Sequence, residues 1–403
     1  MQKQRLDSWK SIADYLKRST RTVQRWHARH GLPVHHLRGP KGAAFAYSDE
    51  IDAWLPGFSR SVVNESALGE GVISARRRSI ELTAAADELW ELRSEKNIHS
   101  ISAMYREAID EDTGNPAAFA GLANALIFAA INGMVDGSMA YPRAQEALNR
   151  LSRMDSKRTD SKCLAAWLDF AWNRNWGRAR SGLEYVLQHQ PRNATALSGR
   201  ALLHIAEGRL SDAWSCAWEA WSLNTLARPL SAELCWISYL AGDYNKSLQT
   251  ISDMRVSGAY GATHAAIEAL ALIQSGSFGS HLERFETVVY EYPHDRTLHG
   301  ALGYFYARTN QQARARAMIE DLGSPSEKKT TAYAVGLIWI GLNRLQDAIQ
   351  SLEASFAAGS RWSLGFRSDP MLKPLMAEPR FVSLLKRVGP QTSNPMMKKP
   401  QRE

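Results

Sequence analysis

Cysteine is scarce in this chain, and none of its cysteines has the short spacing typical of a metal site. Cys163, Cys216 and Cys235 are the three cysteines, and no two of them form a CxxC pair. A disulfide scaffold is therefore excluded, and a zinc ribbon is not expected. Because unpaired thiols suit a reducing compartment, we expect a cytoplasmic protein.

Long apolar runs are also scarce. The chain starts with Met-Gln-Lys-Gln-Arg-Leu-Asp, which lacks the apolar run of a secretory signal. Residues 117–135 form an uncharged stretch that is long enough to cross a bilayer. However, this stretch is mostly alanine, includes Asn124 and Asn132, and lacks the Leu, Ile and Val density that favours insertion. We expect a buried helix here and no contact with a membrane.

Common enzyme signatures are absent from the sequence. It contains no GxxxxGK[ST], GxGxxG, HExxH or GxSxG motif, so we expect no catalytic activity and no cofactor. His27, His30, His35 and His36 lie close together in the sequence, but no Cys or carboxylate completes a convincing set of metal ligands. We therefore expect ordinary polar histidines and no bound metal.

An excess of positive charge occurs only near the N-terminus. The whole chain has 49 Lys and Arg against 41 Asp and Glu, a net charge of +8. Residues 1–60 contain 11 of these basic residues and 5 of the acidic ones, so +6 of the excess lies in this segment. This asymmetry indicates a small anion-binding module joined to a near-neutral body, and nucleic acid is the first candidate for the anion.

Two short helices separated by a tight turn are expected within residues 7–30. A cap at Asp7 or Ser8 begins the first helix, in which apolar residues recur at helical spacing. A cap at Ser19 or Thr20 begins the second helix, and the Gly-Leu-Pro segment that follows ends it. Two such helices across a short connection form a helix-turn-helix motif.

The second of these helices has two chemically different faces. At about 100° per residue, Val23, Trp26 and His30 share the inward side. The opposite side is basic and polar, and arginine suits guanine edges and phosphates whereas glutamine suits adenine. The expected DNA contacts are base edges for Arg21, Gln24 and Arg25, and phosphates for Thr22 and Arg29. A solvated basic face is the alternative.

A basic hairpin follows the two helices. Residues 34–37 and 44–47 are predicted to form short strands, and the turn between them carries Arg38 and Lys41, which we expect to contact phosphates. A closing helix over residues 49–55 completes the segment. A hairpin with a basic tip beside a helix-turn-helix is typical of a wing on the DNA backbone.

This segment resembles the winged helix-turn-helix of the MerR and excisionase type. The strings SWKSIADYL, STRTVQRW, LPVHHL, FAY and DEIDAWL carry the resemblance. It implies sequence-specific binding of double-stranded DNA, with residues 20–29 as the recognition helix and the loop from Arg38 to Lys41 as the wing. Members of this family often bind as dimers, so a homodimer is a further expectation.

The rest of the chain repeats at a regular interval, with a step of about 34 residues. Large apolar residues occur at this spacing, namely Trp176, Leu210, Tyr244 and Phe278. Small residues follow three positions later at Ala179, Ala213 and Ser247, then His281 interrupts the series and Ala315 and Ala348 resume it. Glycines keep the same step two positions before the large apolar residue, at Gly208, Gly242 and Gly276.

Such a unit, two helices with a small residue at their crossing, resembles the tetratricopeptide repeat (TPR). About seven units between residues 80 and 358 imply a superhelical solenoid with a concave surface, and we expect an unidentified protein or peptide to bind in that concave groove. Trp214, Trp218 and Trp221 form one helical stripe, expected to pack one repeat on another, with an aromatic ligand groove as the alternative.

The expected fold class is mainly α, a small winged helix-turn-helix domain followed by a TPR-type α-α superhelical solenoid. The expected boundaries are 1–57 for the DNA-binding domain, 58–79 for a linker, 80–358 for the solenoid, 359–389 for a capping segment and 390–403 for a disordered tail. The strings SDPMLKPL and EPRFVSLLKRVG resemble the end of bacterial TPR regulators, including ToxR/CadC-like sensors.

Two hypotheses about function follow from this organisation. The first is a cytoplasmic, DNA-binding transcriptional regulator whose solenoid binds a protein or peptide partner. The second is a TPR scaffold for protein–protein interaction, in which the helix-turn-helix does not bind DNA.

Overall fold

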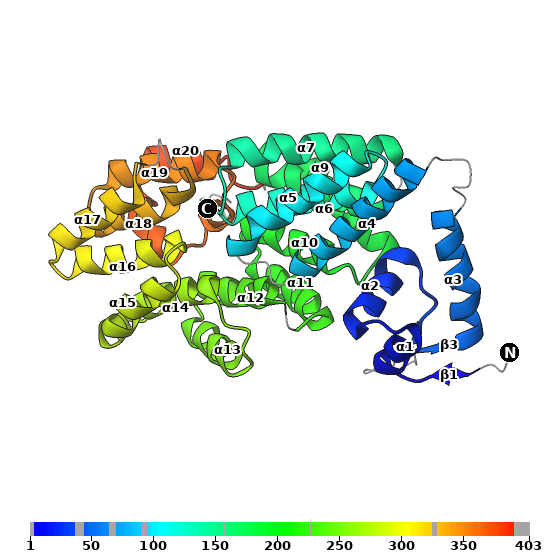
Figure 1. Cartoon of the computed structure of the whole chain (residues 1–403). Coiled ribbons are helices and arrows are strands. Elements are labelled where there is room, and N and C mark those ends of the chain that lie inside the picture. The colour runs from blue at the N-terminus through cyan, green and yellow to red at the C-terminus, as the bar shows by residue number, and fades with distance from the viewer. Residues whose placement is uncertain are drawn as a thin grey trace, which may run out of the picture. The chain divides into compact units, whose positions relative to one another are not determined.

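The computed structural model describes residues 4–36, 44–63, 70–90, 95–155, 158–225, 227–324 and 329–390. The fold is mainly α, and the chain divides into two units, Met1–Arg77 and Arg78–Glu403 (Figure 1). Each unit is described by itself below. No helix in the described ranges is both long and apolar enough to span a bilayer.

The N-terminal unit is a small α+β arrangement. Its described elements are β1 (Arg5–Leu6), α1 (Trp9–Leu16), α2 (Thr20–His30), β2 (His35–His36), β3 (Ala44–Tyr47), α3 (Ser48–Val63) and the first turns of α4 (Glu70–Trp90). The two helices and the two strands after them lie where the sequence predicts them. The sequence does not predict β1, which pairs antiparallel with β3 and makes a three-stranded sheet of order β1-β3-β2.

Side-chain caps set the ends of α1 and α2. The Ser8 side chain accepts a hydrogen bond from the Ser11 N–H, and the Ser19 side chain accepts one from the Thr22 N–H. Gly31, with φ of 67°, ends α2 in the left-handed region that glycine adopts without strain. These caps confirm the expected helix starts at Ser8 and Ser19, and they fix a short connection between the helices.

The core of this unit lies between the two helices and the sheet. It consists of Leu6, Ile12, Ala13, Val23, Leu32, Val34, Ala44, Ala46 and Ile51. Val23 faces inward as the helical wheel predicts, with Trp26 half-buried beside it. Trp26 packs against Trp54 of α3, with ring centroids 6.0 Å apart, so the closing helix is part of this core.

Much of the predicted linker, residues 58–79, is helical. Residues 58–63 continue α3, and residues 70–79 form the first half of α4; the residues between lie outside the described ranges. The reason is local, because α4 contains Ala, Arg, Glu and Leu, which favour helix. Ser79 is fully buried and its hydroxyl donates to the Ala108 carbonyl oxygen at 2.6 Å, so the helix is packed already at that residue.

The larger unit is a stack of helix pairs. Its helices, with short 3-10 and π segments, are α4, α5 (Glu95–Glu111), α6 (Pro116–Ile131), α7 (Gly137–Met154), α8 (Thr159–Leu168), η1 (Asp169–Asn173), α9 (Trp176–His189), α10 (Ala194–Glu207), α11 (Leu210–Leu223), α12 (Arg228–Leu240), α13 (Tyr244–Val256), α14 (Ala262–Gln274), η2 (Phe278–His281), α15 (Leu282–Glu291), α16 (Arg296–Arg308), α17 (Gln312–Leu322), η3 (Lys329–Thr331), α18 (Ala332–Gly341), α19 (Leu345–Ala357), η4 (Arg361–Gly365), η5 (Pro370–Leu375) and α20 (Pro379–Leu385).

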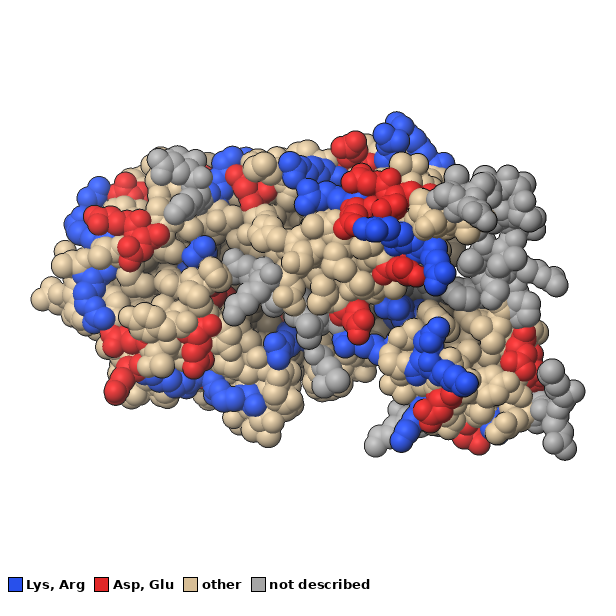
Figure 2. Space-filling model, viewed as in Figure 1, with Lys and Arg blue, Asp and Glu red and all other residues tan. Residues whose placement is uncertain are grey.

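Seven successive pairs run from α6 to α19, and α4 with α5 precede them. The first helices of the seven pairs, α6, α8, α10, α12, α14, α16 and α18, are called the inner helices below. The predicted TPR-like solenoid is thus confirmed. Lysines and arginines are interspersed with acidic residues on the face of the solenoid in Figure 2, as its near-neutral composition predicts.

The small residues of the repeat lie where the two helices of a pair cross. The five small residues that the repeat identifies from Ala179 to Ala348 are all 0% exposed. His281 departs from the pattern because its pair enters the second helix through the 3-10 segment η2, so His281 precedes α15 instead of lying at the crossing. A small residue is therefore required only where the second helix of a pair begins without a 3-10 segment before it.

The C-terminal segment, residues 361–388, covers the inner helices. It runs as η4, η5 and α20, and its apolar residues belong to the same core as the solenoid. Trp362 packs edge-on against Trp236 of α12, and the Cα of Gly365 lies so close to Trp236 and Leu240 that a methyl group would overlap them. Through η4 and η5 this segment contacts α10, α14 and α18, and its last helix, α20, lies beside α19 (Figure 1).

The last pair also returns to the beginning of the solenoid. The Tyr141 hydroxyl of α7 donates to the Gly359 carbonyl oxygen at 2.9 Å. Arg174, just after η1, hydrogen bonds to the Phe356 carbonyl oxygen and lies over the Phe356 ring at 4.0 Å. Burial lowers the pKa of Arg174 to about 10. The end of α19 is thus joined to α7 and to the turn after η1, which lie far from it in the sequence.

Two polar groups anchor the C-terminal segment. Arg361 donates to the Asn132 side-chain oxygen at 3.0 Å and lies 3.9 Å from a carboxylate oxygen of Glu233. Asp369 accepts hydrogen bonds from the hydroxyls of Tyr239 (2.8 Å) and Tyr333 (2.5 Å). Burial raises the pKa of Asp369, although these hydrogen bonds oppose the rise.

The expected binding of a protein or peptide in the concave groove stays a prediction. Residues 361–388 of the same chain pack against the inner helices α10, α12, α14 and α18, which limits the surface left for a partner there. Most apolar residues of that segment are buried, namely Leu364, Phe366, Met371, Leu372, Leu375, Phe381, Leu384 and Val388, whereas Val382 is exposed.

The buried ion pair gives a pH-dependent prediction. Burial raises the pKa of Glu233 to about 7, while Arg361 and Ser198 oppose the rise. In the Arg361→Met variant the pKa of Glu233 rises further, because its buried countercharge is lost. A carboxyl group whose pKa is raised by folding stabilises the folded state at low pH. This contribution to the free energy of unfolding is complete below the pKa of the unfolded state, and it is lost as the pH rises through the pKa of the folded state.

We expect Arg361→Met to cost little near pH 4 and about 3 kcal/mol in the free energy of unfolding near pH 8. Urea unfolding at several pH values measures this. Arg380→Met is the control, since Arg380 pairs with Glu353 on the surface and its loss should cost less than about 1 kcal/mol at any pH. An equal loss at acid and alkaline pH in Arg361→Met would contradict the assignment.

Candidate interaction surfaces

The outer face of α2 is the first candidate surface. Arg21 and Gln24 are exposed and Arg25 is half-buried, so the structure brings these three predicted residues to one side of the helix, opposite Val23. Thr22 is half-buried, and its hydroxyl lies 2.8 Å from the Ser19 hydroxyl. Thr22 is thus part of the cap of α2 as well as a candidate phosphate contact.

The remaining predicted DNA-binding residues are only partly described. Arg29 lies in the last turn of α2, but its side chain is outside the described residues. Arg38 and Lys41 at the predicted wing tip are also outside them. The assignment of this unit as a winged helix-turn-helix, and of its seven residues as DNA contacts, stays a prediction.

Three of the four clustered histidines, His27, His35 and His36, have described contacts, whereas the side chain of His30 lies outside the described residues. His27 Nδ1 lies 2.8 Å from the Leu32 carbonyl oxygen, and its ring packs between those of Trp9 and His36. His35 Nε2 lies 2.5 Å from a carboxylate oxygen of Glu50. Within the described part of the chain, no three His, Cys, Asp or Glu residues converge as metal ligands would.

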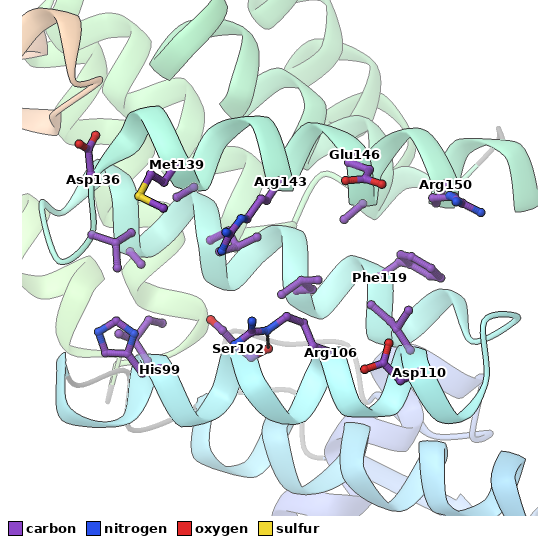
Figure 3. A pocket seen from close by; sticks show the side chains of 18 of the residues that line it. His99, Ser102, Arg106, Asp110, Phe119, Asp136, Met139, Arg143, Glu146 and Arg150 are labelled. Atoms are coloured by element: carbon purple, nitrogen blue, oxygen red, sulfur yellow. Dashed lines mark hydrogen bonds between the residues drawn. The ribbon is translucent and has the colours of Figure 1, made fainter.

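A groove between α5 and α7 is the second candidate surface (Figure 3). Its volume is about 720 Å³ and its floor is α6, which contributes Phe119, Leu122, Leu126 and Ala129. The floor is apolar: Leu122 and Leu126 are half-buried, although they lie in the uncharged stretch expected to be a buried helix. At its rim Met139 is 60% exposed, so apolar surface faces solvent here.

The walls of the groove carry charges of both signs. α5 contributes His99, Ser102, Arg106 and Asp110. α7 contributes Met139, Arg143, Glu146 and Arg150, and Asp136 is the N-cap of α7. In Figure 3, Arg106 and Arg143 reach into the middle of the groove from opposite walls. Arg106 donates to the Ser102 carbonyl oxygen at 3.2 Å, and neither arginine forms an ion pair with a carboxylate within the described ranges.

The groove is held open by close packing on one side of α6. Gly121 lies against the ring of Tyr105, so close that a methyl group on Gly121 would overlap the ring. The Tyr105 hydroxyl in turn donates to the Asp87 carboxylate of α4 at 2.7 Å. α5 is therefore fixed by α4 and by the base of α6. α7 packs on the other side of α6, and the groove lies between them.

The sequence did not identify these groove residues. The rim residues of α5 and α7 belong to the least regular repeats, and charged residues on helices ordinarily face solvent. The sequence offered one sign of the groove, which was the absence of charge in residues 117–135. This absence predicts a buried helix, but it does not show whether another helix covers that helix or leaves it as the floor of a groove.

The tryptophan stripe of α11 (Leu210–Leu223) is a third exposed feature. Trp214 and Trp221 pack against the solenoid core, as expected. Trp218 lies between them, stacked on Trp214 with centroids 5.3 Å apart, and is 47% exposed. The Trp221 indole N–H donates to the Thr225 carbonyl oxygen, and Lys246 covers Trp214 at 3.9 Å, so most of this stripe is occupied by the chain itself.

Comparisons with known proteins support the fold alone. No family model and no curated protein matches the sequence. Among solved structures, the chain is similar to the anaphase-promoting-complex hetero-tetramer Cut9-Hcn1, with a TM-score of 0.53 and 14% identity, over 82% of this chain and 59% of that chain.

Two other solved structures are similar to this chain with lower TM-scores. PilF of Pseudomonas aeruginosa matches with a TM-score of 0.38 and 15% identity, covering 57% of this chain and 97% of that chain. A tetratricopeptide repeat protein from Parabacteroides merdae matches with a TM-score of 0.41 and 15% identity, covering 66% of this chain and 98% of that chain.

The contact between Gly121 and Tyr105 can be tested by substitution. We expect Gly121→Ala to lower the free energy of unfolding by about 1–3 kcal/mol, because the added methyl group overpacks the crossing of α5 and α6. Gly177→Ala is the matched control: Gly177 is also helical, and an added Cβ would meet no atom within 4 Å, so stability should stay equal or rise slightly. Urea unfolding followed by circular dichroism distinguishes the two, and equal midpoints would contradict the packing argument.

Proposed function

We propose that this protein is a non-catalytic interaction scaffold that binds a helical segment of a partner protein in the groove between α5 and α7. The single observation that carries the proposal is the open apolar floor of α6 between two walls, while the inner face of the solenoid is filled by residues 361–388. TPR-like solenoids bury apolar faces between neighbouring helices, and α5 and α7 leave such a face uncovered.

The size of the groove suits one helix. Along α7 it extends from Asp136 to Arg150, which corresponds to about 21 Å of helix axis and about four turns. An amphipathic helix that enters a groove uses apolar residues at i, i+3, i+4 and i+7. Arg106 and Arg143 complement a carboxylate in the middle of such a helix, since both lie over the groove without an acidic partner.

A binding role also agrees with what is solved for a structural neighbour. Cut9 is seen in a hetero-tetramer with Hcn1, so a solenoid of this fold holds a protein partner in that assembly. For the present chain, the partner class is a protein with an acidic amphipathic helix, and we place its binding in the cytoplasm on the basis of the unpaired cysteines.

A designed peptide tests the groove. We propose a fluorescein-labelled helix of about 16 residues, with leucines at the four groove positions and two central glutamates, measured by anisotropy against the full chain. Arg143→Glu should weaken its binding at least about tenfold, because an attractive charge pair becomes repulsive. Arg192→Glu, an exposed charge reversal in the turn before α10, is the control.

A second peptide, with lysines in place of the two glutamates, should recover binding to Arg143→Glu and lose it to the unmodified protein. If the unmodified protein binds both peptides equally, or if Arg143→Glu and Arg192→Glu have the same effect, the groove is not the binding site.

DNA binding by the N-terminal unit is a second candidate function, favoured by the outer face of α2. Arg21, Gln24 and Arg25 lie together on the side of the helix opposite its core, and the two helices and hairpin follow the order of a winged helix-turn-helix. In this proposal α2 enters the major groove of duplex DNA while the solenoid recruits the partner, which makes the chain a transcriptional regulator.

The double substitution Arg21→Ala with Arg25→Ala tests this role in the full chain. We expect a weaker affinity for duplex DNA and a lower slope of log affinity against log salt, because cationic contacts with DNA are lost. Lys10→Ala, an exposed basic residue of α1, is the control for net charge. Binding is measured by anisotropy on a labelled duplex of about 30 base pairs, starting near 50 mM salt.

Absence of DNA binding even at that low salt would leave the interaction scaffold as the function and would contradict the DNA-binding role. Equal effects of the double variant and of Lys10→Ala would assign any DNA binding to another surface.

A further inference from the structure

A polar relay crosses the middle of the solenoid outside both surfaces described above. It links five side chains from three successive helices, namely Arg180 of α9, Arg200, His204 and Glu207 of α10, and Cys216 of α11. The sequence pattern offers no reason for a thiol here, since the repeat requires a small residue at Ala213 and not at Cys216. The relay therefore needs an explanation of its own.

Cys216 lies at one end of this relay between two cationic donors. The Arg200 guanidinium Nε–H donates to the Cys216 sulfur at 3.2 Å, which is short for a hydrogen bond to sulfur. His204, one helical turn further along α10, is the second cation beside Cys216. A thiolate gains more from such charged neighbours than a neutral thiol does.

The other end of the relay keeps His204 protonated and oriented. His204 Nδ1 lies 3.3 Å from a carboxylate oxygen of Glu207, whose side chain is only 2% exposed. Arg180 forms an ion pair with the same carboxylate, and Arg209 approaches it at 3.4 Å. Hydrogen bonds to Cys216 and Glu207 raise the pKa of His204 to about 9.

The three cysteines of the chain consequently differ in their chemistry. Burial is the strongest single influence on Cys216 and opposes ionisation, but hydrogen bonds from His204 and Arg200 outweigh it and the pKa of the thiol is lowered. Burial is the main cause that raises the pKa of Cys163 and of Cys235 to about 12, and nearby carboxylates add to it. Cys216 is also the most accessible of the three, at 7% exposure against 2% and 0%.

We propose that Cys216 is a reactive thiolate and the site of covalent modification of this protein by small, uncharged hydroperoxides. Cys216 is only 7% exposed, which favours a small reagent such as hydrogen peroxide, and the neighbouring arginine and histidine stabilise the anion that attacks it. No Arg, Lys or His among the described residues donates to the sulfur of Cys163 or Cys235, and burial raises the pKa of both thiols.

The reaction balances with the groups that are present. The Cys216 sulfur attacks one oxygen of hydrogen peroxide, a sulfur–oxygen bond forms and the oxygen–oxygen bond breaks. The departing hydroxide takes the proton of the His204 imidazolium and leaves as water. Cys216 is thereby oxidised to a sulfenic acid and the peroxide is reduced, with no further oxidant required.

Alkylation of the folded full chain tests the thiolate. The rate of iodoacetamide addition at each cysteine is measured by peptide mass spectrometry between about pH 5 and pH 9. We expect Cys216 to react at least about tenfold faster than Cys163 and Cys235, with a midpoint of its rate profile below that of an ordinary thiol. His204→Gln and Arg200→Gln should each raise that midpoint, whereas His189→Gln, an exposed histidine of α9, should not.

The profile separates chemistry from exposure. A faster rate at Cys216 with an ordinary midpoint, unchanged in His204→Gln and Arg200→Gln, would show that accessibility alone distinguishes this cysteine and would overturn the proposal. The circular dichroism of each variant is recorded to verify the fold, and Arg200→Lys, which retains a cation, should keep part of the lowered midpoint.

Hydrogen peroxide followed by dimedone tests the modification itself. We expect a dimedone adduct at Cys216 and none at Cys163 or Cys235, and a slower adduct formation in His204→Gln. Equal labelling of all three cysteines, or no adduct at Cys216 under conditions where iodoacetamide reacts with it, would overturn the assignment to hydroperoxides.

Discussion

A single backbone requirement, one residue in the left-handed region after each inner helix, sets the geometry of the solenoid. Gly208, Gly242 and Gly276 have φ between 76° and 78°. Arg174 lies one repeat before Gly208, and Asn310 lies one repeat after Gly276; both have positive φ. Asn343, which is 33 residues after Asn310, also has positive φ. Each such residue reverses the chain within a short turn, so the second helix falls back on the first, and the buried small residue sets how closely the two approach.

This repeated reversal has a consequence for where binding takes place. Because every pair turns alike, the stack curves until the end of α19 meets α7 and the turn after η1. Residues 361–388 pack against α10, α12, α14 and α18, so these inner helices, which are the usual binding surface of an open solenoid, are part of the core here. Unoccupied apolar surface remains where the early pairs are less regular, and the groove between α5 and α7 lies there.

The sequence was most informative where one residue type has one physical role. Serine caps, the small residues at the crossings and three turn glycines predicted the helices correctly. It failed where different residues share a role, because Asn310 and Asn343 tolerate the left-handed region, and Arg174 is held there by its contacts with Phe356. The groove and the filling of the interior depend on contacts between distant segments, such as Tyr141 with Gly359, which no local pattern encodes.

The C-terminal segment needs more than apolar packing to adopt one position. An apolar segment packed on an apolar surface can shift along that surface with little loss of buried area. A buried charge, in contrast, cannot leave its partner without a large desolvation cost. Arg361 has its partners on α12 and at the end of α6, and Asp369 has its partners on α12 and α18. Since these helices belong to different pairs, the two anchors fix the register of the segment and the curvature of the solenoid together. The polar groups in the interior thus specify the arrangement that the apolar residues stabilise.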